Sequence, residues 1–459
     1  MDFRRGGKNN TSWKKGKGSI MDIRGFLGLL EENEELVRIK KGVSPKFELS
    51  AVISTIQRTT NKAVLFESVR GYPHKVASNL LGNHRKLSMA LGCSPNRILK
   101  TLVERWGLTK CVQATAEEER TVFIDDLKLG ECLPMIHHYE KDAGPYITGG
   151  IILAKDPETS EGNLSYHRLQ MTGKDELRLR ITPGHHLGVY FEKAEKMGES
   201  LPVAILIGSS PAVMLAASAN LPLDWDELAF AASLQGEPIG LVGCKTLDLS
   251  VPVDTEIVIE GEILAGIRKP EGPYGDWLGN YVPVTDNHVF KAHAVTMKKS
   301  PIYYTILSGS PEDILLLGLP TATSVFRGIY KVVPTVRDVA CWPFLFHCIV
   351  KLHKTAEGQA KQAAMAAFGA NMEWIKFCIV VDEDVNIYDS SDVFWAIATR
   401  CCPERDVIVI PGIPSFRRDP HKIHWGRVAI DATAPLGLEN EFERKRIPGE
   451  EELRIEDYT

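Results

Sequence analysis

The chain is organised around a stretch rich in proline and glycine, Arg268-Lys-Pro-Glu-Gly-Pro-Tyr-Gly-Asp-Trp-Leu-Gly-Asn280. Proline and glycine at this density cannot continue a helix or a central strand, so we predict a loop. The loop carries two carboxylates, Glu271 and Asp276, and catalytic side chains concentrate on loops held by a rigid scaffold. Two strand-like runs flank it, Glu256–Leu264 and Val289–Met297. The alternative is an acidic surface hairpin without a catalytic role.

Length and composition are those of an ordinary globular protein. The 459 residues suffice for two or three domains, with 44% hydrophobic and 25% charged residues. A net charge of −5 gives no argument for nucleic-acid binding. Nine cysteines without a CxxC pair indicate a reducing, cytoplasmic location. They argue against a disulfide framework or a cysteine-built zinc site.

An uncharged segment, Leu201–Leu223, raises the question of a membrane span. Gly208-Ser-Ser-Pro211 interrupts it, so we predict a strand, a turn and a helix instead. We expect no secretory signal, because no apolar run follows the first basic residues.

Residue patterns divide the chain into four parts. Residues 1–20 are rich in Lys, Arg, Gly and Asn and are predicted to be a disordered basic arm. Residues 21–110 form an N-terminal α/β domain. Residues 111–310 contain many short β-like runs, typical of a barrel or sandwich. Residues 311–459 return to α/β and end in a charged tail, which we expect to leave the core from Glu439 onward.

The periodicity of apolar residues predicts the individual elements. The expected helices are Asp22–Leu36, Asp224–Gln235, Thr355–Phe368 and Asp392–Arg400. The expected strands include Glu35–Lys40, Ala63–Glu67, His74–Asn79, Thr148–Ala154, Leu177–Ile181, Val203–Ile207 and Phe377–Val381.

Three further segments carry groups capable of chemistry, whereas the Walker A, GxGxxG, GxSxG and HExxH motifs are absent. The segments are Glu161–Arg168, Thr182–Gly188 and Asp226–Gly236. Their Asn, His and Glu side chains suit a divalent ion such as Mn²⁺ or Mg²⁺ rather than structural zinc, and such an ion can bridge to a phosphate. Each segment alone also fits ordinary polar turn residues or a solvated helix face.

Local geometry places a condition on this site. Asn163 and Arg168 are five residues apart, so a straight strand would point them to opposite faces. They converge on one site only if a bend or a bound cofactor lies between them.

Taken together, the segments resemble the UbiD decarboxylases, from about Asp22 to about Pro435. The matching stretches are Ser78–Asn83, Gly162–Arg168, Gly184–His186, Asp226–Phe230, Pro270–Asp276 and Lys376–Asp384. The resemblance implies an α/β fold with a central split β-barrel of the flavin-reductase type. It implies prenylated FMN, supplied by a UbiX-type flavin prenyltransferase, with a Mn²⁺-like ion and K⁺. It also implies homodimers or hexamers that form through the C-terminal domain.

The resemblance assigns roles residue by residue. The implied metal ligands are Asn163, His186 and Glu227. The implied catalytic set is Arg168, Glu271 and Asp276. The implied contacts to the flavin or its phosphate are Ser165, Tyr166, Arg168, His185 and Lys376.

The implied reaction is the reversible decarboxylation of an aromatic or α,β-unsaturated acid, with the modified flavin as electron sink. Glu271 would return a proton to carbon, Arg168 would anchor a carboxylate and hold Glu271, and Asp276 would orient the pair or relay the proton. One alternative is a carboxylase that acts on a phenol-type substrate in the reverse direction. Others are a metal-only hydrolase or aldolase without flavin, and a non-catalytic subunit. Neither a nucleic acid nor a membrane is an expected partner.

Overall fold

The computed structural model describes residues 21–108, 112–114, 119–414, 416, 425–445, 447–449, 453 and 458. The chain divides into two compact units, Met1–Thr321 and Ala322–Thr459. The predicted basic arm, residues 1–20, lies outside the described residues. Within these residues, no helix combines the length and the apolar character needed to cross a membrane.

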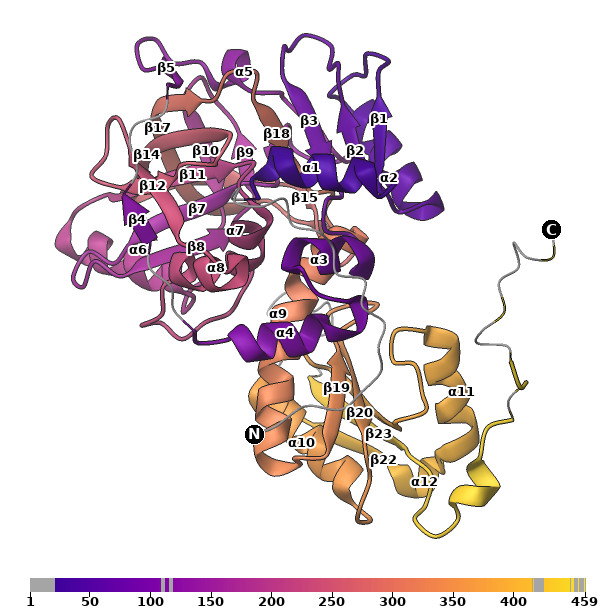
Figure 1. The fold of residues 1–459 in the computed structure, drawn as a ribbon. Helices are drawn as coiled ribbons and strands as arrows, with labels where there is room; N and C mark the ends of the chain where they lie inside the picture. Colours follow the sequence, from indigo (N-terminus) through magenta and orange to yellow (C-terminus); the bar gives the residue numbers. More distant parts are fainter. Residues whose placement is uncertain are drawn as a thin grey trace. The chain divides into compact units, whose positions relative to one another are not determined.

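The first unit begins with a four-stranded sheet of order β1-β2-β3-β18, drawn in indigo apart from β18 (Figure 1). Its strands are β1 (Leu36–Ile39), β2 (Ala63–Phe66), β3 (Lys75–Ser78) and β18 (Ile302–Tyr304). The helices of this region are α1 (Ile23–Glu32), α2 (Glu48–Thr59), α3 (His84–Leu91) and α4 (Ile98–Arg105). Helix α1 begins at Asp22, whose carboxylate accepts a hydrogen bond from the Gly25 N–H at 2.7 Å. The predicted helix and strands of this region are confirmed, although α1 ends four residues earlier than predicted.

A second, larger sheet follows the path β6-β9-β10-β17-β14-β11-β7-β8, and β5 pairs with β17. Its strands are β5 (Thr121–Phe123), β6 (Tyr146–Ile147), β7 (Ile151–Lys155), β8 (Gly162–Tyr166), β9 (Leu169–Met171), β10 (Glu176–Leu179), β11 (Leu201–Ile207), β14 (Ile257–Glu271) and β17 (Thr285–Met297). Strands β8 and β9 lie near opposite ends of this path, yet only His167 and Arg168 join them. A link of two residues spans at most about 11 Å, so the sheet curls until its ends approach. The predicted split barrel is therefore confirmed.

The long hairpin β14–β17 corrects the loop prediction for Arg268–Glu271, the first four residues of the predicted loop. Strand β14 continues to Glu271, and Pro270 pairs with Asp286 of β17. The pairing of β14 with β11 stops at Ile263, so beyond that point β14 is an edge strand. Proline is tolerated on an edge strand because its missing N–H faces no partner. The prediction was wrong for these residues because frequent Pro and Gly indicate a loop. The local sequence does not show that β14 is an edge strand here, where Pro is tolerated.

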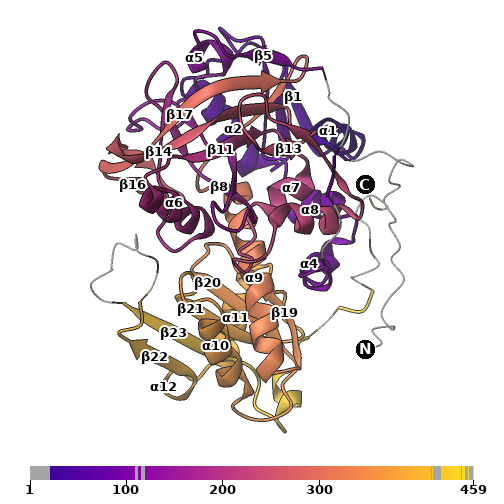
Figure 2. The same cartoon turned by 90° about the vertical axis from the view of Figure 1, so that its left-hand side faces the viewer.

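Helices and two small sheets complete the first unit. The helices are α5 (Leu129–Cys132), α6 (His186–Met197), α7 (Pro211–Ala216) and α8 (Glu227–Gln235). The small sheets contain β4 (Val112–Ala114), β12 (Ile239–Gly243) and β13 (Ser250–Pro252), and β15 (Tyr274–Gly275) with β16 (Tyr281–Val282). Helix α6 packs on β7, β8, β11 and β14, and α8 packs on β8 and α7 (Figure 2). The uncharged segment is strand β11 followed by helix α7, as predicted.

The second unit is a five-stranded sheet of order β19-β20-β21-β23-β22. Its strands are β19 (Val336–Ala340), β20 (His347–Leu352), β21 (Phe377–Asp382), β22 (Val407–Pro411) and β23 (Gly426–Ala432). Helix α9 (Pro311–Val332) crosses the boundary between the units, and α10 (Gln359–Ala370), α11 (Ser390–Arg400) and α12 (Pro403–Asp406) follow. Both faces of β21 are buried. Helix α10 lies on one side of the five-stranded sheet and α11 on the other (Figure 1). Burial on both faces explains the unbroken apolar run of this central parallel strand.

The charged tail does not leave the core at Glu439. A 3₁₀ turn covers Glu439–Phe442, and the Arg444 guanidinium pairs with Asp392 at 2.6 Å. Arg444 also lies over the Trp395 ring at 4.1 Å. The prediction was wrong for this part because the basic side chain finds an acid and an aromatic face on α11.

Gly261 provides a test of the barrel hairpin. It lies at a register shift between β14 and β17, and an added Cβ would stand 2.1 Å from the Lys291 carbonyl oxygen. We predict that Gly261→Ala lowers the free energy of unfolding by roughly 2–4 kcal/mol in urea titrations. Gly243→Ala is the matched control, because nothing lies within 4 Å of its added Cβ. Equal stability of the two variants would contradict the packing described.

The buried His138 ring makes the stability of the fold depend on pH. Its buried ring contacts the Ser50 hydroxyl at 3.1 Å, and burial lowers its pKa to about 4. Because the unfolded chain binds this proton near the ordinary pKa of 6.5, the stabilisation is complete above that pH and is lost as the pH falls toward 4. We predict that the free energy of unfolding falls by about 1.4 kcal/mol for each pH unit as the pH is lowered through this range. The slope should flatten in His138→Gln but not in His293→Gln, whose side chain is 36% exposed.

Candidate active site

The centre of the candidate site is a two-pronged ion pair inside the barrel. Arg168, in the link between β8 and β9, donates from Nε to Glu271 Oε1 at 3.0 Å and from Nη2 to Oε2 at 2.9 Å. The Glu271 side chain is 0% exposed and that of Arg168 is 10% exposed. Glu271 is the last residue of β14, so the ion pair joins residues 103 positions apart. Parallel N–H···O bonds of this kind fix both position and orientation.

Two further donors complete the surroundings of Glu271. The Tyr146 hydroxyl donates to Oε1 at 3.0 Å, and the Asn287 side-chain amide donates to Oε2 at 2.9 Å. Tyr146 is in β6 and Asn287 is in β17, and both side chains are buried. Each carboxylate oxygen therefore accepts two hydrogen bonds.

Arg168 also contacts two residues of the predicted loop. Its guanidinium lies over the Tyr274 ring at 4.7 Å, and its Nη1 is 3.7 Å from Asp276 Oδ2. Burial opposes the charge of Arg168, but the contact with Glu271 outweighs it, and the pKa of Arg168 is raised. Arg168 is therefore a permanent cation between two acids.

A short preceding segment holds Tyr274 and Asp276 in place. The Gly275 N–H donates to Asp142 Oδ1 at 2.7 Å, and the Ala143 N–H donates to the Pro273 carbonyl at 2.9 Å. A Cβ on Gly275 would stand 2.5 Å from the Tyr139 ring, so only glycine permits this approach. Burial raises the pKa of Asp142.

The predicted metal ligands lie at the start of two helices. His186 is the first residue of α6 and Glu227 the first of α8, with His186 Nδ1 3.5 Å from Glu227 Oε1. The other oxygen of Glu227 accepts the Leu164 N–H at 3.0 Å, next to Asn163. Burial raises the pKa of Glu227. The structure thus brings the three predicted ligands into one neighbourhood.

This donor set fits a divalent cation. The separation of 3.5 Å exceeds a good hydrogen bond, but two ligands at about 2.0–2.2 Å from one ion can span it. Among the described residues no group of three His, Cys, Asp or Glu side chains could hold a metal ion. The predicted third ligand is the side-chain amide of Asn163. An amide with a His and a carboxylate favours Mn²⁺ or Mg²⁺ over structural zinc.

The remaining residues predicted to contact the flavin lie in different surroundings. The Ser165 hydroxyl contacts both the Asn163 amide and His167 Nε2, at 3.1 and 3.0 Å. The Tyr166 hydroxyl is buried without a hydrogen-bond partner among the described residues, and its contact with the flavin stays a prediction. His185 is the exposed N-cap residue of α6. Lys376 belongs to the second unit, and its contact with the flavin stays a prediction.

Sequence reasoning missed Tyr146, Asn287 and Asp142. None belongs to the segments that carry the resemblance, and each reaches the site through a contact across strands or loops. Their local sequence gives no signal, because Asp142 and Asn287 lie among other polar residues and Tyr146 fits an ordinary buried strand.

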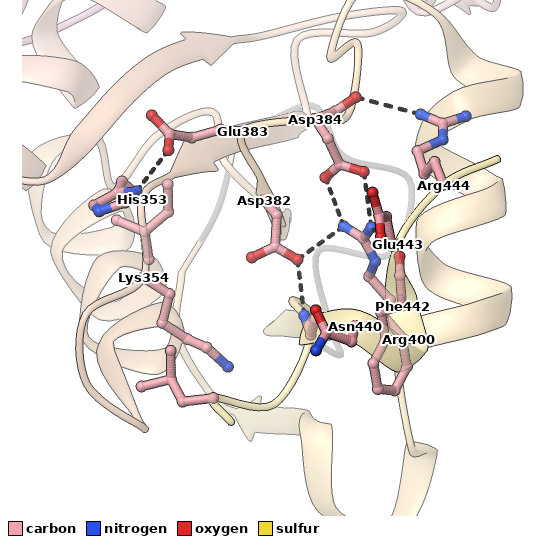
Figure 3. A pocket seen from close by; sticks show the side chains of 13 residues that line it. His353, Lys354, Asp382, Glu383, Asp384, Arg400, Asn440, Phe442, Glu443 and Arg444 are labelled. Carbon is pink, nitrogen blue, oxygen red and sulfur yellow. Dashed lines mark hydrogen bonds and ion pairs between the residues drawn. The ribbon is translucent and has the colours of Figure 1, made fainter. Parts of the chain in front are cut away.

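The second unit contains a separate cavity of about 520 Å³ beside the ends of β20, β21 and β23 (Figure 3). Arg400 donates to Asp382 and Asp384 at 2.8 Å each, and His353 pairs with Glu383. Most charged side chains of this cavity thus pair with one another, and no predicted site residue lines it. The first unit therefore carries the candidate active site.

Comparison with protein families gives a match along most of the chain. The models of 3-octaprenyl-4-hydroxybenzoate carboxy-lyase match in three parts: the N-terminal domain at residues 27–106, the Rift-related domain at 110–311 and the C-terminal domain at 314–432. These are the UbiD family models.

Individual relatives match over nearly their whole length. Anhydromevalonate phosphate decarboxylase of Methanosarcina mazei is 38% identical over 443 residues, covering 94% of this chain and 100% of the relative. Phenolic acid decarboxylase of Bacillus subtilis is 29% identical over 445 residues, covering 92% and 94%.

Two solved structures share the fold. The UbiD-class enzyme HmfF from Pelotomaculum thermopropionicum, in complex with FMN, has a TM-score of 0.91 and 37% identity, covering 95% of this chain and 100% of that one. An evolved dimeric form in complex with prFMN has a TM-score of 0.88 and 36% identity, covering 96% and 100%.

The predicted ligands can be tested by metal analysis. We predict that Glu227→Ala and His186→Ala each fold but lose most of the bound divalent ion and retain flavin poorly, because each removes one of the three predicted ligands. Elemental analysis and flavin absorbance of the purified variants measure both effects. His293→Ala, outside the site, is the control. An unchanged metal content in both variants would remove these residues from the ligand set.

Proposed function

The chain belongs to the UbiD family of carboxy-lyases, and on this basis we propose that it decarboxylates an α,β-unsaturated or aromatic acid with prenylated FMN and a divalent ion. Members of the family are decarboxylases. The observation that carries the proposal is the buried pairing of Arg168 with Glu271, with Asp276 beside it. This arrangement provides one fixed cation for a substrate carboxylate and two acids for proton transfer.

The cofactor proposal rests on the relatives and on the donors of this site. Solved relatives bind FMN or prFMN. Ser165, Tyr166 and His185 would contact the flavin or its phosphate, together with Lys376. Asn163, His186 and Glu227 would hold the divalent ion, whose positive charge would offset that of the cofactor phosphate, and K⁺ is proposed as a further ion. When bound, prenylated FMN would supply the electron sink that allows CO₂ to leave.

The protein's own residues would perform the binding and the proton transfer. Arg168 attracts the substrate carboxylate and keeps Glu271 in a fixed orientation. After CO₂ leaves, the proton passes from a Glu271 carboxyl oxygen to the substrate carbon, so an O–H bond breaks and a C–H bond forms. Asp276, 3.7 Å from Arg168, orients the guanidinium or relays a proton to Glu271. The same groups serve the reverse carboxylation, because each step is reversible.

The relatives favour one substrate class over the other. The relative named for anhydromevalonate phosphate is 38% identical, whereas the one named for phenolic acids is 29% identical. We therefore propose an α,β-unsaturated acid as the first candidate and an aromatic acid as the second. A UbiX-type prenyltransferase would supply the cofactor, and the chain would assemble as a homodimer or hexamer through its C-terminal domain.

The proposal predicts the effect of Glu271→Gln. The amide keeps the shape of the side chain but cannot give up a proton, so we expect kcat to fall by roughly 10²–10⁴-fold or more. Flavin content should change little, because no flavin contact is assigned to Glu271. CO₂ release from anhydromevalonate phosphate and from aromatic acids measures the effect.

Glu262→Gln is the matched control for this experiment. Glu262 is on the same strand, β14, but its side chain is 33% exposed and faces His293. Decarboxylation by Glu271→Gln at the rate of the control would remove Glu271 from the mechanism.

A further inference from the structure

The cavity of the second unit lies at the carboxyl ends of parallel strands (Figure 3). Strands β20 and β21 are neighbours and run parallel. The chain leaves β20 toward α10 and leaves β21 toward α11, and these helices cover opposite sides of the sheet. Such a divergence opens a crevice between the carboxyl ends of the two strands, which is where open α/β sheets bind ligands. The volume of about 520 Å³ falls within the range of roughly 300–1,000 Å³ that is typical of small-molecule sites.

Most charged groups of the cavity wall are paired within the protein. Arg400 donates to Asp382 and to Asp384, at 2.8 Å in each case. Glu383 pairs with Arg337 at 2.6 Å. These pairs hold the wall in place and offer little to a ligand.

Lys354, which follows β20 directly, is an exception. Its side chain is 4% exposed, and it contacts Glu357 at 3.3 Å, whose own side chain is 62% exposed. A pair with such an exposed acid contributes little, and an ammonium group has three donors. Lys354 can therefore bind a further acceptor in the cavity.

Asp382, the last residue of β21, is the second exception. Its hydrogen bonds from Arg400 and from the Ala434 N–H both reach Oδ2, at 2.8 and 2.7 Å. Within the part of the chain that the structure describes, Oδ1 accepts no hydrogen bond, and Figure 3 shows it on the same side of the cavity as the Lys354 ammonium. Burial raises the pKa of Asp382 although Arg400 and Lys354 oppose this. The carboxylate would therefore gain from a further cation at Oδ1.

The cavity thus presents one cation and one carboxylate oxygen to a ligand. A purely anionic or purely cationic ligand would leave one of the two unmatched, whereas a ligand with neighbouring charges of both signs matches both. An apolar surface completes the wall. It consists of Leu352, Ala434, Leu436 and Phe442.

We propose that this cavity binds a free α-amino acid with an apolar side chain, with its carboxylate on Lys354 and its ammonium on Asp382. The apolar side chain of the ligand packs against Leu436 and Phe442. This inference is independent of the proposed decarboxylation, because none of these residues takes part in it.

The first test measures binding to the full-length purified chain by isothermal titration calorimetry. We expect saturable binding of L-leucine or L-phenylalanine with a Kd below about 1 mM. The matching acids without an amino group are isocaproate and hydrocinnamate, and the matching amines without a carboxylate are isoamylamine and phenethylamine. Each analogue should bind at least about 10-fold more weakly, because it loses one charge-assisted hydrogen bond.

The second test assigns this binding to the cavity. We expect Lys354→Met and Asp382→Asn each to weaken binding of the amino acid by about 10-fold or more, because each removes one charged partner. In Lys354→Met the Kd should approach that of the amine. Glu383→Gln is the matched control, because Glu383 lines the same cavity but pairs with Arg337 and His353. If Asp382→Asn does not fold, Lys354→Met and the analogues decide alone.

Three outcomes would overturn the inference. The first is the absence of saturable binding of either amino acid up to about 10 mM. The second is an acid or amine analogue that binds as tightly as the amino acid, which would leave only one charged contact. The third is binding to Lys354→Met that equals binding to Glu383→Gln, which would place the amino acid at another site. None of these outcomes bears on CO₂ release, which tests the proposed function separately.

Discussion

The pairing of Arg168 with Glu271 is the constraint on which the rest of the site depends. Burial of two opposite charges is costly unless their geometry is good and their remaining hydrogen-bonding positions are filled. Here both conditions hold, because Tyr146 and Asn287 fill the positions that Arg168 leaves open. Removal of either charge would leave the other buried without compensation. The ion pair is therefore a poor source of net stability but a precise means of orientation.

The topology of the barrel brings these residues together. The two-residue link from β8 to β9 closes the curled sheet and places Arg168 at the closure, while the edge of β14 ends in Glu271. On the other side of this link, β8 carries Asn163 toward the first turns of α6 and α8. One short segment thus carries both a predicted metal ligand, Asn163, and the arginine of the buried ion pair, Arg168. On one straight strand, Asn163 and Arg168 would point to opposite faces. Strand β8 ends at Tyr166, so Arg168 lies outside it and is not bound by that alternation.

Local sequence patterns predicted most elements but not the contacts between distant strands. The helix after Asp22 and the buried strand at Phe377 follow from periodicity, which acts within a few residues. The loop expected at Arg268 was wrong because sheet pairing, not local propensity, decides whether Pro270 can lie in a strand. Tyr146 and Asn287 could not be found this way, since they meet Glu271 across 125 and 16 residues. The family resemblance predicted the two acids and the metal ligands. The hydrogen-bond donors around Glu271 were found only in the three-dimensional structure.

We infer that this chain is a flavin-dependent decarboxylase. The most direct measurement is the visible absorption spectrum and CO₂ release of the purified chain, expressed with and without a flavin prenyltransferase. We expect a flavin spectrum in the purified chain, and CO₂ release from an unsaturated or aromatic acid only when the prenyltransferase is present. A chain without flavin under both conditions, or with equal CO₂ release in both, would contradict it.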